Sequence, residues 1–331
     1  MDVIERPVLE GAARLPGMFE GFVRTGAALE MKAFTGVSGD SGGYAVPREI
    51  DAAIDRALAS ISPIRRIAQV VKVGSAGYRK LVTTGGTPSG WAAETDPRPG
   101  TATPVFQEIA PPTGELYANP SASQAMLDDA AFDVEAWLAD EIATEFARAE
   151  GAAFVNGSGV NRPRGFLQAP VSAAADAGRA FGTLQYLPSG AAGDFGAAPQ
   201  ERLIDLVQSL RAPYRQGAVF VMNAATVSRL RKFKTSDGAF LWQPGLQAGQ
   251  PATLLGYPVV EAEDMPDVAA NAAAIAFGNF RLGYLIAERT ETAILRDPYS
   301  NKPFVSFYAT KRVGGQVLNA EAIKVMKFAA S

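Results

Sequence analysis

The chain contains neither histidine nor cysteine among its 331 residues, and these two absences narrow its chemistry more than its length does. Without histidine there is no imidazole base near neutral pH, no Ser/His or Cys/His nucleophile pair, and none of the usual nitrogen ligands for zinc. Without cysteine there is no thiolate chemistry and no disulfide. Catalysis would have to rely on carboxylates, lysine, tyrosine or a Ser/Lys pair.

An excess of charge and long apolar runs are lacking as well. The chain has 31 Lys and Arg against 34 Asp and Glu, a formal net charge of -3, so no cationic excess marks nucleic-acid binding as its main activity. No run reaches the ~18 uncharged apolar residues of a membrane-spanning helix, and residues 1–7 lack the apolar stretch of a signal peptide. We therefore expect no membrane partner. At roughly 150 residues per domain, the length predicts about two domains.

Glycine and proline, by contrast, are abundant in one window. Twelve of the residues from 72 to 112 are Gly or Pro, and two β-like runs, 78–84 and 101–109, flank the densest part. This pattern predicts a long hairpin that projects from the body, because its strands pair with each other while its tip has little core of its own. Trp91 falls in that tip. Its large apolar ring is expected to pack on another subunit, with local packing as the alternative.

The remaining pattern is of mixed helices and strands. Residues 1–38 are expected to form an extended or partly helical arm, followed by glycine-rich sequence and a short helix at 48–58. The strongest helix signal covers about 133–156, with apolar residues that include Trp137 on one face and an acidic face that includes Glu150. A second helix is expected at 200–211. Beyond it we expect a strand at 218–222, a helix at about 223–232, and short strands at 253–261, 274–277, 284–288, 292–295, 305–310 and 321–327.

Several motifs suggest chemistry, but a structural role explains each of them better. Residues 39–43 read Gly-Asp-Ser-Gly-Gly, as around the nucleophile of trypsin-like proteases, but that serine needs an imidazole to accept its proton, so a hinge is the better interpretation. Paired acids at 128–129, at 94 and 96, and between 261 and 267 are more typical of caps and turns than of a carboxylate dyad or a cation site. The basic run at 229–234 suits a helix C-terminus. No phosphate-binding loop is present. We predict no catalytic residue, no cofactor and no metal site.

A longer series of motifs resembles a known family. Asp128-Asp129, the long helix and the block from Phe154 to Leu167 (FVNGSGVNRPRGFL) are similar to the major capsid protein of tailed bacteriophages with the Hong Kong phage-type (Johnson) fold, including prophage and gene-transfer-agent capsids. Further matches follow in the family's order over about residues 40–328: GGYAVP at 42–47, VMN at 221–223, DGAFL at 237–241, LGYPV at 255–259 and FGN at 277–279.

The resemblance implies an α+β Johnson fold in four parts. These are an N-terminal arm (1–38), a peripheral domain (39–71, 113–216 and 303–331) with a spine helix at about 133–156, an extended β-hairpin loop (72–112) and an axial domain (217–302). It also implies self-assembly as pentamers and hexamers into an icosahedral shell around double-stranded DNA, in the host cytoplasm. The implied partners are a portal protein, a scaffolding protein and a prohead protease in trans, with a decoration protein as a further candidate.

Specific residues take roles under this resemblance. Trp91, Glu94, Arg98 and Phe106 are expected to contact a neighbouring subunit through the loop. Gly42, Gly43, Gly74 and Gly77 are expected to act as hinges between quasi-equivalent copies. The acidic face of the spine helix, Asp140, Glu141 and Glu145, would suit a shell lining from which DNA is repelled, so that contact with DNA is non-specific.

Two departures from the family pattern and two alternatives qualify the expectation. Some members cross-link subunits through a loop lysine, and the counterpart of that lysine here is Gln107, so we predict no covalent cross-link between subunits. Members with a fused scaffolding domain carry about a hundred more N-terminal residues than this chain does.

The alternatives are an encapsulin-like nanocompartment shell of the same fold and, in a different class, a histidine-free hydrolase that uses paired carboxylates.

Overall fold

The computed structural model describes residues 62–330, apart from 75–76, 85–88, 93, 96–97, 99, 102, 104, 130–133 and 235–251. All of the described residues belong to one unit, residues 46–331. The expected arm at 1–38, the helix at 48–58 and the hinge residues Gly42 and Gly43 lie outside the described residues.

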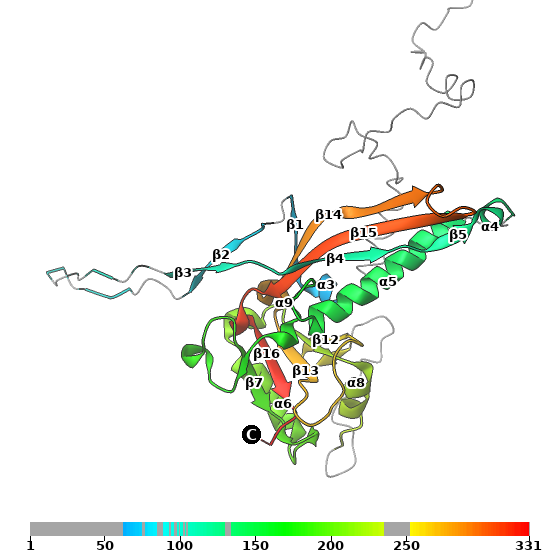
Figure 1. The fold of residues 1–331 in the computed structure, drawn as a ribbon. Coiled ribbons are helices and arrows are strands. Elements are labelled where there is room, and N and C mark those ends of the chain that lie inside the picture. The colour runs from blue at the N-terminus through cyan, green and yellow to red at the C-terminus, as the bar shows by residue number, and fades with distance from the viewer. Residues whose placement is uncertain are drawn as a thin grey trace, which may run out of the picture. The chain divides into compact units, whose positions relative to one another are not determined.

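The first sheet is long and is built from strands that lie far apart in the sequence (Figure 1). Its order is β1-β14-β15-β4, and β5 also pairs with β15. The β1 strand is parallel to β14, and the other pairs are antiparallel. The strands are β1 (Gln69–Val73), β4 (Thr113–Ala118), β5 (Ser121–Ser123), β14 (Tyr284–Asp297) and β15 (Phe304–Val317). Residues 284–288 and 292–295, expected as two strands, form one strand whose register with β15 shifts between Arg289 and Ala293.

The long helix α5 (Val134–Asn156), which the sequence pattern predicted at about 133–156, packs on one face of this sheet. Ile142 and Phe146 contact Ala309 of β15, and Leu138 packs with Val305 and Phe307 nearer the start of the helix. The expected apolar face is wrong at two positions, since the Trp137 side chain is 49% exposed and Ala149, expected on the same face, is exposed too. We call the face of the sheet opposite α5 the outer face. Two short helices, α3 (Pro63–Ile67) and α4 (Gln124–Asp129), precede α5.

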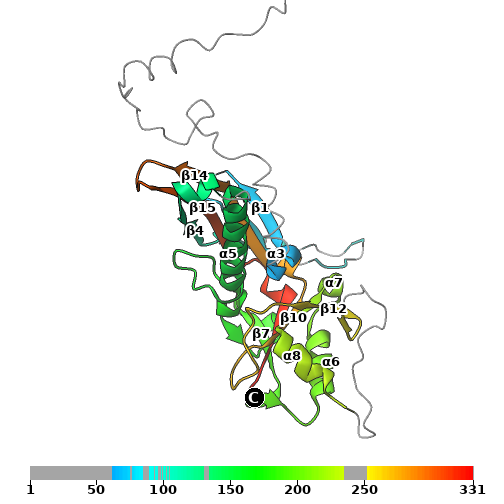
Figure 2. The same ribbon diagram turned by 90° about the vertical axis from the view of Figure 1, so that its right-hand side faces the viewer.

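The second sheet is seven-stranded and mixed, in the order β11-β12-β10-β13-β16-β7-β6. Its strands are β6 (Val171–Ser172), β7 (Leu184–Pro188), β10 (Val219–Met222), β11 (Thr253–Leu254), β12 (Tyr257–Glu261), β13 (Ile275–Gly278) and β16 (Ile323–Lys327). Figure 2 shows α6 (Pro199–Ser209) and α8 (Ala224–Arg231) together beside β10. Their apolar residues join the aromatic core around Phe220 and Phe277. Other small elements among the described residues include one strand pair and five short helices. The strands are β8 (Gly190–Ala191) and β9 (Asp194–Phe195), and the helices are η1 (Phe166–Gln168), η2 (Asp176–Gly178), α7 (Ala212–Arg215), α9 (Phe280–Gly283) and η3 (Ala320–Ala322).

Strands from both sides of the expected 302/303 boundary share each sheet. In the long sheet β14 pairs with β15, and in the second sheet β13 pairs with β16. The division into peripheral and axial domains therefore stays a prediction about how parts of the chain behave in an assembled shell.

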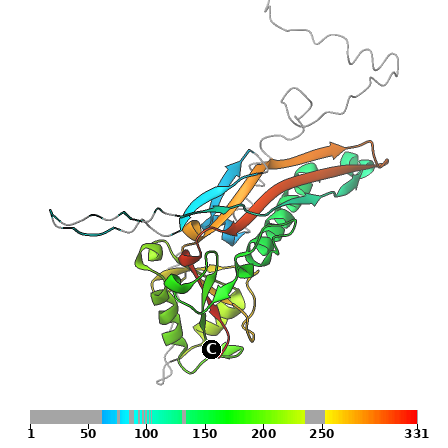
Figure 3. The same ribbon diagram turned by 60° about the vertical axis from the view of Figure 1, so that its left-hand side comes forward.

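The hairpin of β2 (Lys80–Thr84) and β3 (Val105–Ile109) leads away from both sheets (Figures 1 and 3). The two strands pair antiparallel, with Lys80 opposite Ile109 and Thr84 opposite Val105. At its base, Ile109 packs with Leu285 and Leu318 on the outer face of the long sheet. One end of the hairpin is therefore anchored by apolar packing, while the strands continue beyond that anchor.

Candidate functional site

The hairpin presents apolar side chains to solvent along its length. Leu81 on β2 and Val105 and Phe106 on β3 are each more than half exposed, and Trp91 in the tip is fully exposed. Glu94 and Arg98 lie in the same tip and are exposed too. Of the four loop residues predicted to contact a neighbour, three therefore share the tip and Phe106 lies nearer the body. Exposed apolar side chains grouped on a projecting element are typical of a surface that another chain covers.

The two described hinge candidates lie where the chain leaves the long sheet for the hairpin. Gly74 directly follows β1, and Gly77 comes three residues before β2. A Cβ atom placed on either glycine would have no atom within 4 Å. No packing requirement therefore explains glycine at these positions, and their role as hinges stays a prediction.

The acidic face of α5 is smaller than the sequence pattern indicated. Asp140, Glu141 and Glu145 are exposed, and Glu145 forms an ion pair with Arg148 one turn later. Glu150, which the pattern placed on the same face, is buried instead. Asp140, Glu141 and Glu145 therefore form an exposed acidic face, whereas Glu150 has a different role in the interior.

Glu150 belongs to a buried ring of two cations and two carboxylates. Lys311 on β15 lies 2.9 Å from Glu150 and 3.0 Å from Glu288 on β14, and Arg65 on α3 lies 3.0 Å and 2.5 Å from the same two carboxylates. Burial opposes ionisation of Glu288, but Lys311 and Arg65 outweigh it and hold its pKa below the usual value. The ring links α3 and α5 to the middle of the long sheet, and its charges balance.

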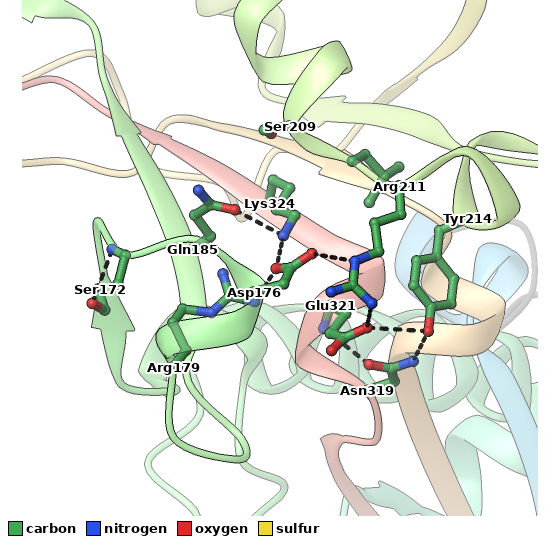
Figure 4. Close-up of polar contacts among 12 residues, drawn as sticks. Ser172, Asp176, Arg179, Gln185, Ser209, Arg211, Tyr214, Asn319, Glu321 and Lys324 are labelled. Atoms are coloured by element: carbon green, nitrogen blue, oxygen red, sulfur yellow. Dashed lines mark hydrogen bonds and ion pairs between the residues drawn. The ribbon is translucent and has the colours of Figure 1, made fainter. Parts of the chain in front are cut away.

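A second buried network joins the loop after β6 to the second sheet (Figure 4). Asp176 on η2 accepts hydrogen bonds from Lys324 on β16 and from Arg179, and lies 3.4 Å from the Nε atom of Arg211. Lys324 also donates to Gln185 on β7 at 2.9 Å. Burial lowers the pKa of both Lys324 and Arg179, and their contacts with Asp176 offset this only in part. Residues 321–327, expected as a strand, include β16, which is buried on both faces. Asp176 neutralises the buried Lys324 side chain.

The same network continues toward the surface through Glu321. Arg211 donates to Glu321 at 3.2 Å, and Asn319 donates to the Tyr214 hydroxyl at 3.1 Å. In total, three cations (Arg179, Arg211 and Lys324) share two carboxylates (Asp176 and Glu321). This arrangement could not be predicted from the sequence, because its members lie far apart along the chain.

The paired acids do not converge in the described part of the chain. Glu94 lies in the hairpin tip, Asp129 ends α4, and the acids between 261 and 267 lie at the end of β12 and just after it. Burial, and to a lesser degree the neighbouring Glu263, raises the pKa of Asp264. Asp267 accepts a hydrogen bond from Asn223 at 2.7 Å. No group of three or more acidic residues close enough to hold a metal ion occurs among the described residues.

The motif blocks instead have structural roles. Gly157 and Gly165 follow α5, and a Cβ atom on either would lie 2.3 Å from a backbone oxygen, of Pro163 and Val155 respectively. The backbone N–H of Arg164 donates to Gly315 on β15 at 2.9 Å. Asn223 and Asn279 each cap the helix that follows them, by accepting from the N–H three residues later. The block after α5 therefore fastens the end of the long helix to the long sheet.

No helix in the described ranges is both long and apolar enough to cross a lipid bilayer.

Comparison with known proteins shows that the chain is similar to capsid proteins. The family model described as the phage capsid family matches residues 42–328. Two solved structures, the capsids of an empty and of a native gene transfer agent (GTA) particle, each computed with C5 symmetry, are 51% and 52% identical to this chain. Each match has a TM-score of 0.76 and covers 81% of this chain and 90% of the other.

More distant structures share the fold alone. A chain of Microbacterium phage Oxtober96 is 13% identical, with a TM-score of 0.60 over 81% of this chain and 91% of the other. A chain of Gordonia phage Cozz is 15% identical, with a TM-score of 0.56 over 82% and 87%. The curated proteins gave no match.

Proposed function

Because the chain belongs to the phage capsid family, we propose that it is the major capsid protein of a particle of the gene-transfer-agent type. It is a structural protein and not an enzyme, like the capsid proteins it matches. Its copies would assemble as pentamers and hexamers into an icosahedral shell that encloses double-stranded DNA. The observation that carries the proposal is the identity of 51–52% to the capsids of GTA particles over 81% of the chain.

The hairpin is the element best suited to join neighbouring copies. Its exposed side chains Leu81, Trp91 and Phe106 lie beyond the part that its own sheet covers. Burying such side chains against a second copy removes apolar surface from water, at roughly 25 cal/mol for each Å². One such contact for every subunit is modest, but a closed shell repeats it at every subunit, and many modest contacts add up to a stable particle.

The acidic face of α5 would turn toward the packaged DNA. Asp140, Glu141 and Glu145 place like charges opposite the phosphates, so that DNA is confined without being bound tightly. The further partners of such a shell would be a portal protein, a scaffolding protein and a prohead protease supplied by other chains, with a decoration protein as a further candidate. The predicted peripheral and axial domains and the arm at 1–38 belong to the same proposal.

Particles purified from producing cells test the proposal. Electron microscopy should show closed icosahedral shells made of this chain, and extraction after nuclease treatment should release protected double-stranded DNA. A compact monomer or dimer under the same conditions would contradict the proposal. Shells that hold a cargo enzyme and no DNA would point instead to the nanocompartment alternative.

A further inference from the structure

A cavity opens on the outer face of the long sheet, beside the base of the hairpin. It has a volume of about 360 Å³, and its wall includes Val73, Tyr78, Pro111, Asn161, Arg289 and Arg312. Along β14 the side chains alternate: Glu288 belongs to the buried ring on the α5 side, so its neighbours Ala287 and Arg289 face the other way, into the cavity.

The cavity lies beside the part of the outer face that the hairpin base covers. Nearer the start of β14, Leu285 is fully buried under Ile109 and Leu318, with Val71 and Tyr78 packed against them. Four residues further along β14, Arg289 is only half-buried. The hairpin base therefore covers the first part of this face and leaves the next part open.

The charge on the cavity wall is not balanced. Arg289 lies directly opposite Arg312 in the antiparallel pair of β14 and β15, a placement that is unfavourable for like charges. Arg312 is neutralised by Glu115 on β4, whose carboxylate lies 2.7 Å from its Nε atom. Across the residues that the structure describes, the guanidinium of Arg289 has neither an ion pair nor a hydrogen bond. One positive charge on the wall thus lacks a partner within the described chain.

We propose that this cavity receives the hairpin tip of a second copy of the chain, with the carboxylate of Glu94 from that copy paired to Arg289. The proposal rests on the proposed function, since it requires that copies assemble, and it adds where the tip docks. The tip offers what the cavity lacks: Glu94 is an exposed carboxylate, and it follows the fully exposed Trp91 by three residues. The apolar part of the wall, Val73, Tyr78 and Pro111, provides a surface for the ring.

A charge exchange tests the pairing. Arg289→Glu places two acids together across the interface, and we expect it to lower the yield of closed particles about tenfold or more, because the contact recurs at every subunit. Glu94→Arg alone should lower the yield similarly. The double variant Glu94→Arg/Arg289→Glu restores an ion pair of reversed polarity, and we expect its yield to return to near that of the unchanged protein. The melting temperature of each unassembled variant checks that the chain still folds.

Each outcome separates this inference from the proposed function. If the unchanged protein forms shells and Arg289→Glu forms them equally well, the docking site is wrong and the proposed function stands. If Arg289→Glu is rescued by Glu145→Arg and not by Glu94→Arg, the occupant is the α5 face of another copy and the inference is overturned.

The absence of cysteine allows an independent measurement, since Glu94→Cys and Arg289→Cys would carry the sole thiols. A short bismaleimide should then join copies into a ladder on a denaturing gel, and monomers only would contradict the proposal.

Discussion

Two sets of charged side chains hold distant parts of this chain together, and the two sets differ in their net charge. Arg65, Glu150, Glu288 and Lys311 carry two charges of each sign, and each carboxylate has two cationic partners. Around Asp176, three cations share two carboxylates. Removing one partner from a buried set leaves an uncompensated charge, which costs far more than losing a pair on the surface. The two sets therefore predict different responses to single substitutions.

In the Asp176 network, the carboxylate should matter more than the lysine. Asp176→Asn leaves Lys324 and Arg179 buried without their main anion, and we expect a loss of about 3–5 kcal/mol in the free energy of unfolding. Lys324→Met removes a cation from a set with one too many, and its loss should be less than half as large. Urea denaturation of the unassembled protein measures both. A larger loss for Lys324→Met would contradict this order.

Glu288 should make the long sheet sensitive to acid. Its folded-state pKa lies below the ordinary value of 4.5, so it contributes stability above pH 4.5 that is lost as the pH falls through the lower folded value. Glu288→Gln removes this titration and leaves Lys311 with one carboxylate. We expect it to lower the free energy of unfolding at pH 7 by about 3–5 kcal/mol and to flatten its fall at acid pH.

Glu145→Gln is the matched control, because Glu145 is an exposed acid on the same helix as Glu150. It should change the free energy of unfolding by less than about 1 kcal/mol. Urea melts at a series of pH values provide the measurement, and an unchanged pH profile in Glu288→Gln would contradict the role of the buried ring.

At the scale of elements, the hairpin contributes little to the stability of its own chain beyond its base. Ile109 is buried, whereas Leu81, Trp91 and Phe106 are exposed in the single chain. A substitution in the exposed part should therefore affect the contact between copies and not the folding of one copy. This separation makes the hairpin the most direct place to test assembly.

Trp91→Ala should leave the melting temperature of the unassembled protein unchanged and lower the yield of closed particles. Phe181→Ala, at another exposed aromatic residue, is a matched control and should assemble normally. Particle counts by electron microscopy measure the effect. Equal losses in both variants, or none in Trp91→Ala, would argue against a specific contact through the tip.

The acidic face of α5 predicts an effect on DNA and not on folding. Glu141→Lys/Glu145→Lys places two cations where the proposed function puts the DNA, so we expect slower or incomplete filling and release. Glu201→Lys/Asp205→Lys on α6 reverses two exposed acids at the same spacing and serves as the control. Quantifying DNA in purified particles provides the test. Unchanged filling and release in the α5 variant would remove the support for this role.

The three longer helices α5, α6 and α8 and the hairpin could be predicted from the sequence because their patterns are local, whereas the short helices α3, α4, α7 and α9 were missed. Apolar residues repeat along α5 and α6, and the glycine and proline content marks the hairpin. The strands that were missed include β1 and β4 at the edges of the long sheet and β7 inside the second sheet. Each of these is short and is stabilised mainly by a partner at least 130 residues away. The burial of Glu150 and Lys324 could not be predicted either. A charged side chain indicates an exposed position unless its partners are known, and here they come from other elements.

At the scale of the whole molecule, the shell should be held together without covalent bonds. Gln107 stands at the position that the resemblance assigns to a cross-linking lysine, and its amide is not a nucleophile. Boiling purified particles in SDS should release a single monomer band. Particles treated with glutaraldehyde show that the gel resolves multimers, and a ladder without that treatment would contradict the prediction.

The pairing of β1 with β14 has a consequence for how the protein is made. Residues 69–73 find their sheet partner at 285–289, and β16, at residues 323–327, lies inside the second sheet between β13 and β7. A nascent chain therefore cannot close either sheet until residues 285–327 have left the ribosome. Prematurely ended chains would lack both the anchor of the hairpin and the surface on which a hairpin docks. The topology therefore predicts that only chains that extend beyond residue 327 can fold and join the growing particle.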